Sequence, residues 1–458
     1  MYDYDLIIIG AGAAGLTATF TALGFGKKVL VVEQAKPGGE CTWSGCIPSK
    51  ALIHLADRSH NRSPDTDRPA MEQVREVIAK VYQEETPEKL KQAGADYVQG
   101  QAVFTDSHTI QVEGAGYSAT NFIIATGSSP LVPPLAGIDD IQPLTNDNFF
   151  QQPELPKSLL VLGAGPIGIE LAQACNRLGT SVTVVDMLPT ILFREEPALS
   201  EMLFKHLQQE GLKFHLGLKV SSVAPSEKGV EMLLSGNGRE ITLQADQLLI
   251  AAGRRPNVEN LGLEAIGVKT DNGIMVNRKM QTSLPHIYAC GDVAGPYQFS
   301  HMANYQAKTA TLNAILPFKR KVDNDLAIWV TYTDPEFARI GLTEAEARKK
   351  YGNKIRVYEY DFAKLDRCKT HPDEFGLMKL ICDQKSRVLG AHILAPRAGE
   401  LICEIQLLKQ LGLPFSKLQS VVHPYPGYAD SLRQLSQQVY LDNLQRNPLI
   451  KLVKKLKR

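Results

Sequence analysis

An apolar strand, a glycine-rich turn, a helix, a second strand and an acidic residue occur in this order twice in the chain. The first copy contains the apolar run 6–9, the glycine pattern 10–15 and Glu33. The second contains the run 158–162, the pattern 163–168 and Asp186. In such a unit the glycines let the backbone approach a pyrophosphate at the helix N-terminus, and the acid binds a ribose hydroxyl. The repeat predicts an α/β chain with two Rossmann-like dinucleotide-binding domains, in which parallel strands are covered on both faces.

Cys41 and Cys46 lie five positions apart, shortly after the first glycine pattern. Residues five apart on an ideal helix are separated by roughly 7.5 Å along the axis, whereas a disulfide needs Cα atoms only about 4.4–6.8 Å apart. If the two pair, the segment must be a distorted first turn, with Gly45 supplying the backbone freedom. A thiol near a helix N-terminus has a lowered pKa, which favours the reactive thiolate. Two buried structural cysteines are the alternative interpretation.

The segment 38–50, GGECTWSGCIPSK, resembles the redox signature GGTCxNxGCxPSK of the flavoprotein disulfide reductases. This family includes dihydrolipoamide dehydrogenase, glutathione reductase and mercuric reductase. The resemblance implies a redox-active disulfide in which Cys46 contacts a flavin and Cys41 exchanges with the substrate. It also implies FAD at the first glycine pattern and a nicotinamide donor at the second. Glu40 and Trp43 replace the usual threonine and asparagine, so the pocket beside the disulfide is expected to differ.

Further motifs resemble the same family and supply its remaining binding residues. Glu170, just past the third glycine of the second pattern, matches the glutamate that the family pairs with the lysine of the redox segment, here Lys50; an exposed helix acid is the alternative. The stretch 122–128 resembles the strand and ATG motif of the FAD domain, and 253–257 resembles the loop that returns to the flavin. The predicted cofactor-binding residues are Gly10, Gly12, Ala14, Gly15, Glu33, Gly39, Thr42, Lys50, Ala125, Thr126, Gly127, Gly163, Gly165, Gly168, Glu170, Asp186, Gly253, Arg254, Gly291 and Asp292.

The second acidic residue bears on the choice of nicotinamide coenzyme. Asp186 favours a free ribose 2′-hydroxyl, because a carboxylate repels a 2′-phosphate. Arg194, eight positions later, is placed to reach such a phosphate. The predicted cofactors are therefore FAD and NADH, with NADPH not excluded.

The C-terminal part departs from the family pattern where an acid–base group is expected. In dihydrolipoamide and glutathione reductases the signature HxHPTxxE, contributed by the partner subunit, holds a catalytic histidine and its glutamate. Without gaps, His423, Tyr425 and Asp430 match the outer histidine, the catalytic histidine and the glutamate; in the rival register His423 is the catalytic histidine. A phenol titrates near about pH 10 and shuttles protons poorly at neutral pH. A tyrosine here resembles mercuric reductases, whose C-terminal cysteine pair has no counterpart in this sequence.

These motifs predict a homodimeric flavoenzyme of the mercuric-reductase-like branch. Electrons pass from NAD(P)H through FAD to the Cys41–Cys46 disulfide and on to a small disulfide, a metal ion or another electrophile, and the partner subunit completes the active site. Dihydrolipoamide dehydrogenase is one alternative; a redox sensor or membrane-docked electron-transfer partner is another. The predicted catalytic residues are Cys41, Cys46, Lys50, Glu170, Tyr425, Asp430 and His423. The predicted domains are 1–150 (FAD, first part), 151–265 (NAD(P)), 266–328 (FAD, second part) and 329–458 (α+β dimerisation).

Composition limits the remaining partners and the location. A net charge of +1 over 458 residues gives no global field that would recruit nucleic acid. No apolar run approaches the roughly 20 residues of a membrane span, and the first residues lack a signal-peptide pattern. Seven scattered cysteines argue against a secreted disulfide framework, and those outside the redox segment are expected to be small buried side chains. A cytoplasmic protein without a metal site is predicted.

Three weaker patterns complete the prediction. Residues 59–69 are polar and predict a loop. Residues 71–85 predict a helix whose apolar face contains Val74, Val77, Ile78 and Val81. The basic tail 449–458 interleaves apolar residues, which suits weak contact with an anionic membrane surface. A solvated terminus is the more ordinary explanation of that tail.

Overall fold

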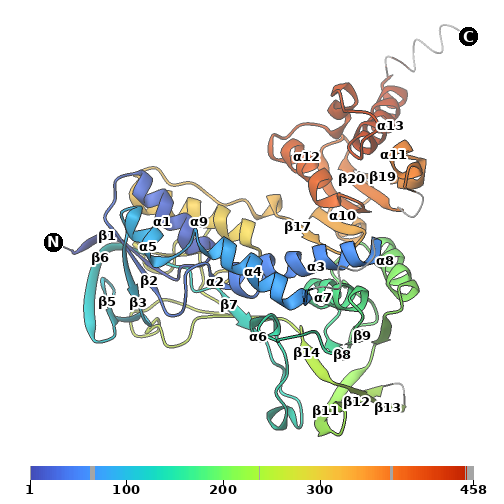
Figure 1. Cartoon of the computed structure of the whole chain (residues 1–458). Coiled ribbons are helices and arrows are strands. Elements are labelled where there is room, and N and C mark those ends of the chain that lie inside the picture. The colour runs from blue at the N-terminus through green and yellow to red at the C-terminus, as the bar shows by residue number, and fades with distance from the viewer. Residues whose placement is uncertain (1, 62–67, 237, 372–374, 449, 451–458) are drawn as a thin grey trace, which may run out of the picture. The chain divides into compact units, whose positions relative to one another are not determined.

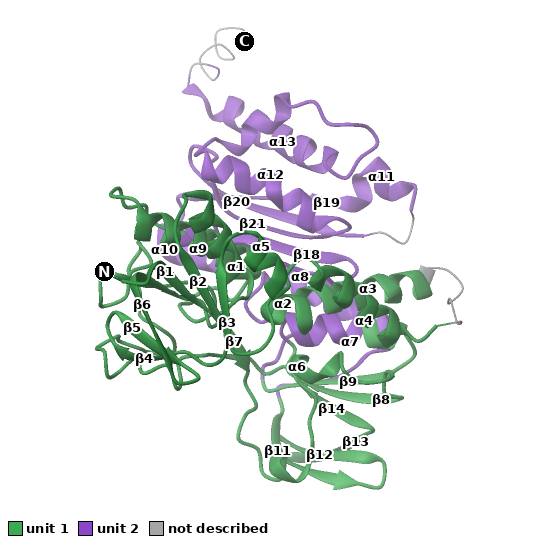
Figure 2. Ribbon diagram, turned by 60° about the vertical axis from the view of Figure 1, so that its left-hand side comes forward, with its two compact units in different colours: residues 1–164, 174–187, 218–323 green, residues 165–173, 188–217, 324–458 purple. Residues whose placement is uncertain are grey.

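The computed structural model describes residues 2–61, 68–236, 238–371, 375–448 and 450 (Figure 1). The chain forms two compact units, coloured separately in Figure 2. The first unit contains residues 1–164, 174–187 and 218–323, and the second contains 165–173, 188–217 and 324–458. The tail 449–458, for which membrane contact is predicted, lies outside the described residues except for residue 450.

The first unit is built on a seven-stranded sheet centred on β1 (Tyr4–Ile9). Its parallel pairs are β1 with β2 and β6, β2 with β3, and β6 with β16; β4 and β5 extend β6 in antiparallel fashion. The strand β16 comes from far along the chain, so the chain returns to its first sheet. The bounds are β2 (Val29–Glu33), β3 (Asp96–Gln99), β4 (Val103–Asp106), β5 (Thr109–Val112), β6 (Ala115–Ile124) and β16 (Ile287–Ala289).

Strand β1 is covered on both faces, as the continuous apolar run predicts. Its side chains alternate between two buried clusters: Leu6 and Ile8 lie in one, Ile7 and Ile9 in the other. In the first cluster, helix α1 (Ala13–Gly24) packs against α9 (Ser300–Ile315) through alanines spaced mostly one turn apart (Figure 1). Small side chains at this spacing let two helices approach closely. The contributing alanines are Ala14, Ala18 and Ala22 of α1 and Ala303, Ala307 and Ala310 of α9.

The second glycine pattern follows β8 (Ser158–Leu162), which pairs in parallel with β9 (Ser181–Asp186) and β14 (Gln247–Ile250). Helix α7 (Pro166–Arg177) begins within the pattern. The first unit also contains a three-stranded antiparallel sheet, β11-β12-β13, and a two-stranded antiparallel ribbon in which β15 pairs with β7. Their bounds are β11 (Lys219–Ser226), β12 (Gly229–Gly236), β13 (Arg239–Ala245), β7 (Ser128–Pro130) and β15 (Arg254–Pro256); the short helix α6 spans Asn146–Phe149.

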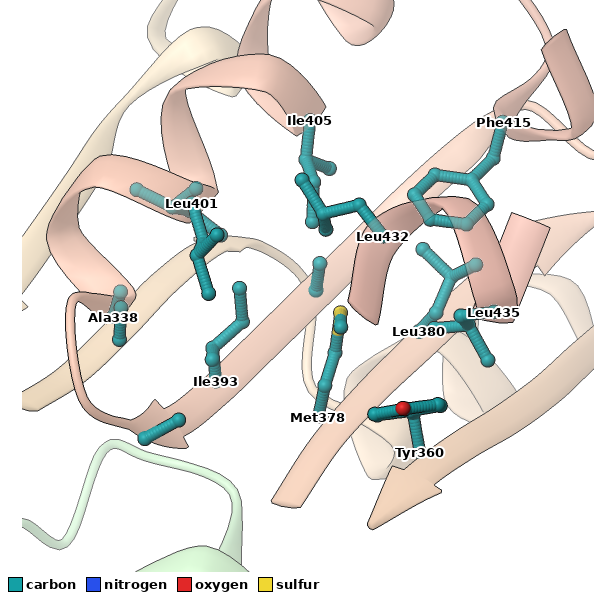
Figure 3. Close-up of a cluster of buried hydrophobic side chains, with 14 of the residues drawn as sticks. Ala338, Tyr360, Met378, Leu380, Ile393, Leu401, Ile405, Phe415, Leu432 and Leu435 are labelled. Carbon is teal, nitrogen blue, oxygen red and sulfur yellow. The ribbon is translucent and has the colours of Figure 1, made fainter. Parts of the chain in front are cut away.

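The second unit contains a five-stranded antiparallel sheet in the order β17-β18-β21-β20-β19. Helices α12 and α13 pack on it: Figure 3 shows Leu401 and Ile405 of α12 with Leu432 and Leu435 of α13 near Met378 of β20. The strands are β10 (Lys213–Leu216), β17 (Ile328–Thr331), β18 (Glu336–Gly341), β19 (Ile355–Asp361), β20 (Leu377–Asp383) and β21 (Val388–Ala395). The helices are α8 (Pro197–Gln209), α10 (Glu344–Tyr351), α11 (Asp366–Lys369), α12 (Ala398–Gln410) and α13 (Asp430–Arg446).

Three local predictions need correction. The loop predicted over 59–69 is wrong for residues 59–61, because these belong to α3 (Cys46–Asn61). Residues 62–67 lie outside the described part of the chain. The helix predicted over 71–85 is α4 (Ala70–Tyr82), but Val77 is 40% exposed rather than on the apolar face. Cys403 is exposed on α12, whereas the other four cysteines outside the redox segment are buried. No described helix is long and apolar enough to span a bilayer.

Candidate active site

Cys41 and Cys46 lie on two consecutive helices separated by a break. Cys41 belongs to α2 (Gly39–Trp43), and Cys46 is the first residue of α3. Ser44, with φ −143°, ends α2. The φ of Gly45 lies outside the left-handed region, so the break does not use the freedom predicted for that glycine. The chain is therefore distorted between the two cysteines, as their spacing requires for a pair.

The side chains of Cys41 and Cys46 are hydrogen-bonded to each other. Ser300, the first residue of α9, places its Oγ 3.4 Å from Cys46 Sγ. The hydrogen bond with Cys46 and burial raise the pKa of Cys41, although the Ser300 hydroxyl lowers it. The lowered pKa expected of a thiol in this segment is therefore wrong for Cys41. Sulfur atoms in contact are what a disulfide between these residues needs.

The redox segment 38–50 lies directly against the first glycine pattern. The Gly38 N–H donates to the Ala11 carbonyl at 2.9 Å. A Cβ on Gly39 would lie 2.6 Å from the Cα of Gly12, so only glycine allows this approach of the two backbones. The Glu33 carboxylate accepts a hydrogen bond from the Ala11 N–H at 2.7 Å, which ties the end of β2 to the same turn. The redox segment and the first glycine pattern, which are separate motifs in the sequence, are thus in direct backbone contact.

The start of α1 fits the pyrophosphate of FAD. Among the described residues no side chain caps its N-terminus at Gly12, and its first turn carries no acidic residue. Its first backbone N–H groups therefore remain available for an anion, which the helix dipole favours. Glu33 keeps carboxylate lone pairs for a ribose hydroxyl although it also accepts from the Ala35 N–H at 2.9 Å. Ala14 and Gly15 continue α1 from this turn as buried residues.

The other predicted FAD residues cluster at the carboxyl ends of β1, β6 and β16, where ligands bind in open α/β sheets. Ala125 follows β6 and donates its N–H to the Ile9 carbonyl at 2.8 Å; Cys290 follows β16 and donates to the Ile124 carbonyl at 3.0 Å. Thr126 is held by a hydrogen bond from its Oγ1 to the Asn257 carbonyl at 2.7 Å. The remaining members of the same turns are Gly10, Gly127, Gly291 and Asp292.

The second glycine pattern repeats the local geometry of the first. Asp186, at the end of β9, accepts a hydrogen bond from the Ala164 N–H at 2.7 Å, as Glu33 does from Ala11. Gly163 belongs to the first unit, whereas Gly165 and Gly168 belong to the second. Glu170, also in the second unit, is buried on α7 and accepts from the Tyr332 N–H at 2.7 Å. Lys50 lies on α3 of the first unit, and its pairing with Glu170 stays a prediction.

A polar network links the redox segment to β7, β15 and the turn after β16, which are the loops predicted to face the flavin. β15 pairs with β7 with Arg254 opposite Pro130, and the Arg254 side chain reaches along the ribbon, where its Nε donates to Ser128 Oγ at 2.8 Å. Ser128 Oγ donates onward to Asp292 Oδ2 at 2.6 Å. On its other side, Arg254 Nη2 donates to Glu40 Oε2, and Asn146 Nδ2 donates to Glu40 Oε1 at 2.8 Å. Ser128 is the last residue of the stretch 122–128 that resembles the family motif, whereas Asn146 carries no sequence signal that would have singled it out.

Two carboxyl groups in this network have displaced pKa values. Burial raises the pKa of Glu40 to about 7 despite the Arg254 charge, and the charges of Asp292, Asp147 and Cys46 add to the rise. Burial also raises the pKa of Asp292, against the Ser128 hydrogen bond and the Arg254 charge. A carboxyl group that titrates near neutral pH beside a thiol pair is suited to proton transfer.

The second departure from the family signature, Trp43, has a packing explanation. Its Nε1 donates to the Pro37 carbonyl at 2.9 Å, and its ring lies 4.6 Å from that of Tyr82 on α4. The neighbouring Thr42 is buried and donates to Glu85 Oε2 at 2.7 Å. The contact with Tyr82 links α2 to the end of α4, and the bond to Glu85 links it to the residues that follow α4. Of the two unusual residues, only Glu40 therefore brings a titratable group to the thiols.

The predicted acid–base residues lie in the second unit, each with its own partner. Tyr425 is 73% exposed and donates to Asp366 Oδ2 at 3.1 Å, which raises its pKa. Burial raises the pKa of Asp430, but hydrogen bonds from Arg433 and Gln434 outweigh it, for a net decrease. The side chain of His423 is 4% exposed, and its Nε2 lies 3.1 Å from Glu404 Oε2 on α12. The pairing of His423 with Glu404 was not foreseen, because Glu404 lies on α12, outside the segment that matches the signature.

The fold and the paired thiols define a flavin- and nicotinamide-dependent oxidoreductase with a separate dimerisation domain. The family model for pyridine nucleotide-disulphide oxidoreductases matches residues 4–307, and the model for the dimerisation domain of the same family matches 328–436. The chain therefore belongs to the pyridine nucleotide-disulphide oxidoreductases. This confirms the predicted family, fold class and enzyme class.

Characterised relatives fall into different branches of this family. The chain is 35% identical over 447 residues to a mercuric reductase of Staphylococcus aureus, covering 94% of this chain and 81% of that protein. It is 36% identical over 458 residues to the dihydrolipoyl dehydrogenase of Thermus scotoductus, covering 96% and 98%. The HOCl-induced flavoprotein disulfide reductase RclA from Escherichia coli, in its Cu(II) complex, superposes with a TM-score of 0.86 at 28% identity, covering 96% of this chain and 100% of that one. Sequence similarity alone therefore assigns the chain to a class of oxidoreductases but does not identify its electron acceptor.

Proposed function

We propose that the chain is a homodimeric NAD(P)H-dependent flavoenzyme that passes two electrons to a Cys41–Cys46 disulfide and on to a small disulfide, a metal ion or another electrophile. The observation that carries this proposal is the contact between the Cys41 and Cys46 thiols. The thiols lie in a segment that the first glycine pattern holds through Gly38 and Gly39. When bound, FAD accepts a hydride from the nicotinamide and delivers two electrons to the disulfide.

The two sulfurs have different roles in this proposal. Cys46, at the start of α3 and beside Ser300, is the thiol on the flavin side, where the helix dipole stabilises its thiolate. Cys41, whose pKa is raised, keeps its proton longer and exchanges with the substrate. Arg254, Ser128 and Asp292 position the flavin-side loops. NADH is the proposed coenzyme because Asp186 is fixed at the ribose end of β9.

Anaerobic titration with NADH tests the relay. The expected result is a long-wavelength absorbance band from a thiolate beside the flavin. Cys46→Ser should abolish the band, whereas Cys41→Ser should show it already in the oxidised enzyme. Cys403→Ser, which removes an exposed cysteine on α12, serves as the matched control and should titrate like the unmodified enzyme. Absence of the band from the unmodified enzyme at full FAD occupancy refutes the proposal.

Dihydrolipoamide dehydrogenase is the second candidate function. Two observations favour it: the 36% identity to the enzyme of Thermus scotoductus, and the His423–Glu404 pair, which resembles an oriented acid–base histidine. This function requires rapid NAD-dependent oxidation of dihydrolipoamide. Slow oxidation at full FAD occupancy excludes it.

A panel of acceptors separates the candidates. Lipoamide, glutathione disulfide, mercuric ion, cupric ion and quinones are each assayed with NADH and with NADPH; cupric ion is included because RclA was determined as a Cu(II) complex. Preferential reduction of one metal ion supports the mercuric-reductase-like branch. Preferential reduction of lipoamide supports the dehydrogenase.

A further inference from the structure

Glu40 is a carboxylate that the redox segment carries next to Cys41. Its side chain is 29% exposed, and that of its ion-pair partner Arg254 is 9% exposed. Asn146 Nδ2 donates to its second oxygen at 2.8 Å. Both carboxylate oxygens are thus held in place, on the residue that precedes the exchanging thiol.

The groups that face Glu40 come from four different elements and carry unequal charge. Arg254 of β15 is the one cation among them in the described part of the chain. Asp292, after β16, and Asp147, on α6, are carboxylates, and Cys46 of α3 becomes a thiolate when the pair is reduced. Arg254 contacts the carboxylates of Glu40 and Asp292. Asn146 Nδ2 donates to both Glu40 Oε1 and Asp147 Oδ1. The cluster thus holds three carboxylates and one guanidinium, and reduction adds the negative charge of the Cys46 thiolate. Such a cluster favours the uptake of a proton.

We propose that Glu40 takes up a proton when the Cys41–Cys46 disulfide is reduced and releases it when the dithiol is oxidised by substrate. This inference rests on the proposed function. Reduction is balanced as NAD(P)H + Cys41–S–S–Cys46 + Glu40–COO⁻ + H⁺ giving NAD(P)⁺ + Cys41–SH + Cys46–S⁻ + Glu40–COOH. The S–S bond breaks, the hydride supplies both electrons, and the proton that Cys46 does not hold resides on Glu40.

The second half of the cycle returns that proton. A disulfide acceptor RSSR needs two electrons and two protons to give two RSH. Cys41–SH supplies one proton, Glu40–COOH supplies the other, and the Cys41–Cys46 disulfide and the Glu40 carboxylate are restored. A carboxyl group with a pKa near about 7 is matched to this task at neutral pH. The Tyr425 phenol is less suited to giving up a proton at neutral pH, because its hydrogen bond to Asp366 raises its pKa.

The pH dependence of thiol reactivity tests this coupling. The holoenzyme is reduced, pulsed with iodoacetamide between pH 5 and pH 10, and the labels on Cys41 and Cys46 are counted by mass spectrometry, since only thiolates react. In the unmodified enzyme the labelling rate of Cys46 should rise in two steps, because its titration interacts with that of Glu40. In Glu40→Gln the labelling rate of Cys46 should rise in one step at lower pH. Its rate at pH 7 should be at least about threefold higher, which corresponds to a decrease of half a unit in the pKa of Cys46.

Two further variants keep the test decisive. Asp147→Asn leaves the Glu40–Arg254 pair intact but removes a like charge, so the lower step should move to lower pH. Glu85→Gln removes a carboxylate that contacts α2 through Thr42 and should keep both steps where they are. Identical profiles in the unmodified enzyme, Glu40→Gln and Asp147→Asn overturn the inference.

The test also separates this inference from the proposed function. If NADH generates no new thiols in the unmodified holoenzyme, the proposed electron relay fails. Reduction by a phosphine still allows the labelling profiles to be measured in that case. With either reductant, loss of the two-step profile in Glu40→Gln supports proton uptake by Glu40. Unchanged profiles refute that role of Glu40 and leave the proposed electron relay untouched.

Discussion

The backbone of Gly39 lies so close to Gly12 that a Cβ on Gly39 would be 2.6 Å from the Gly12 Cα. Gly39 also has a φ of +58°, which side chains rarely adopt. Through this contact the start of the redox segment packs against the first glycine pattern, which is the predicted nucleotide-binding turn. We therefore expect cofactor binding and the positioning of the thiols to depend on the same few backbone atoms.

Replacing Gly39 by alanine should disturb both functions. The added methyl group must push the two backbones apart, which typically costs about 1–3 kcal/mol of folding free energy. We expect a lower FAD-to-protein absorbance ratio and a lower melting temperature. Gly24→Ala is the control, because a Cβ on Gly24, at the end of α1, would meet no described atom beyond its own helix within 4 Å. Full FAD content in Gly39→Ala would contradict this view of the turn.

Asp186 should decide which of the two coenzymes, NADH or NADPH, the enzyme prefers. Its carboxylate is fixed by the Ala164 N–H at 2.7 Å and repels a 2′-phosphate. In Asp186→Ser the ratio of kcat/KM for NADPH to that for NADH should rise at least about tenfold, since a like-charge contact costs on the order of 1–4 kcal/mol. Arg194→Ala tests the open alternative: a loss confined to NADPH would show that Arg194 binds the phosphate.

Tyr425 and His423 can be separated by their variants. In the ungapped register, Tyr425→Phe should slow acceptor reduction about fivefold, the effect of one hydrogen bond of roughly 1 kcal/mol. The rate of flavin reduction by NADH, measured by stopped flow, should not change, because the hydroxyl acts only on the acceptor side. Rapid lipoamide turnover that survives Tyr425→Phe but fails in His423→Ala would establish the other register.

His392 should make the second unit sensitive to acid. Burial is the main cause that lowers its pKa to about 4; the charges of Arg339 and Lys379 also lower it, and Glu196 and the hydrogen bond to Leu342 oppose this. The fold favours the neutral ring, so this contribution is complete above the unfolded pKa of about 6.5 and is lost as the pH falls towards 4. Between these values the free energy of unfolding should fall by about 1.4 kcal/mol per pH unit.

Urea denaturation from pH 7 to pH 4.5, followed by hydrogen exchange in β21, measures this dependence. His392→Gln keeps a donor for the Leu342 carbonyl but does not titrate, so its stability should depend less on pH. His371→Gln, at an exposed position, is the control and should behave like the unmodified enzyme. Equal slopes for all three proteins would show that His392 does not titrate as the fold requires.

Much of the candidate site follows from local sequence. The glycine patterns require close backbone approach, and the acids Glu33 and Asp186 accept from the N–H of Ala11 and Ala164 in the same way. Apolar runs such as 6–9 predict covered strands, because a strand alternates its side chains between two faces. Local reasoning fails where the outcome depends on distant neighbours, as at Val77 and Cys403, whose exposure depends on what packs against their helices.

The sequence by itself determined the two strand–glycine–helix repeats, the redox segment and the family, because each of these depends on residues close together in the chain. Only the tertiary structure decided the environment of the thiols. Ser300 reaches Cys46 from α9, and Arg254 and Asn146 reach Glu40 from separate elements of the first unit. The physical reason is that burial and charge, which set the proton affinity of Glu40, are sums over groups far apart in the sequence.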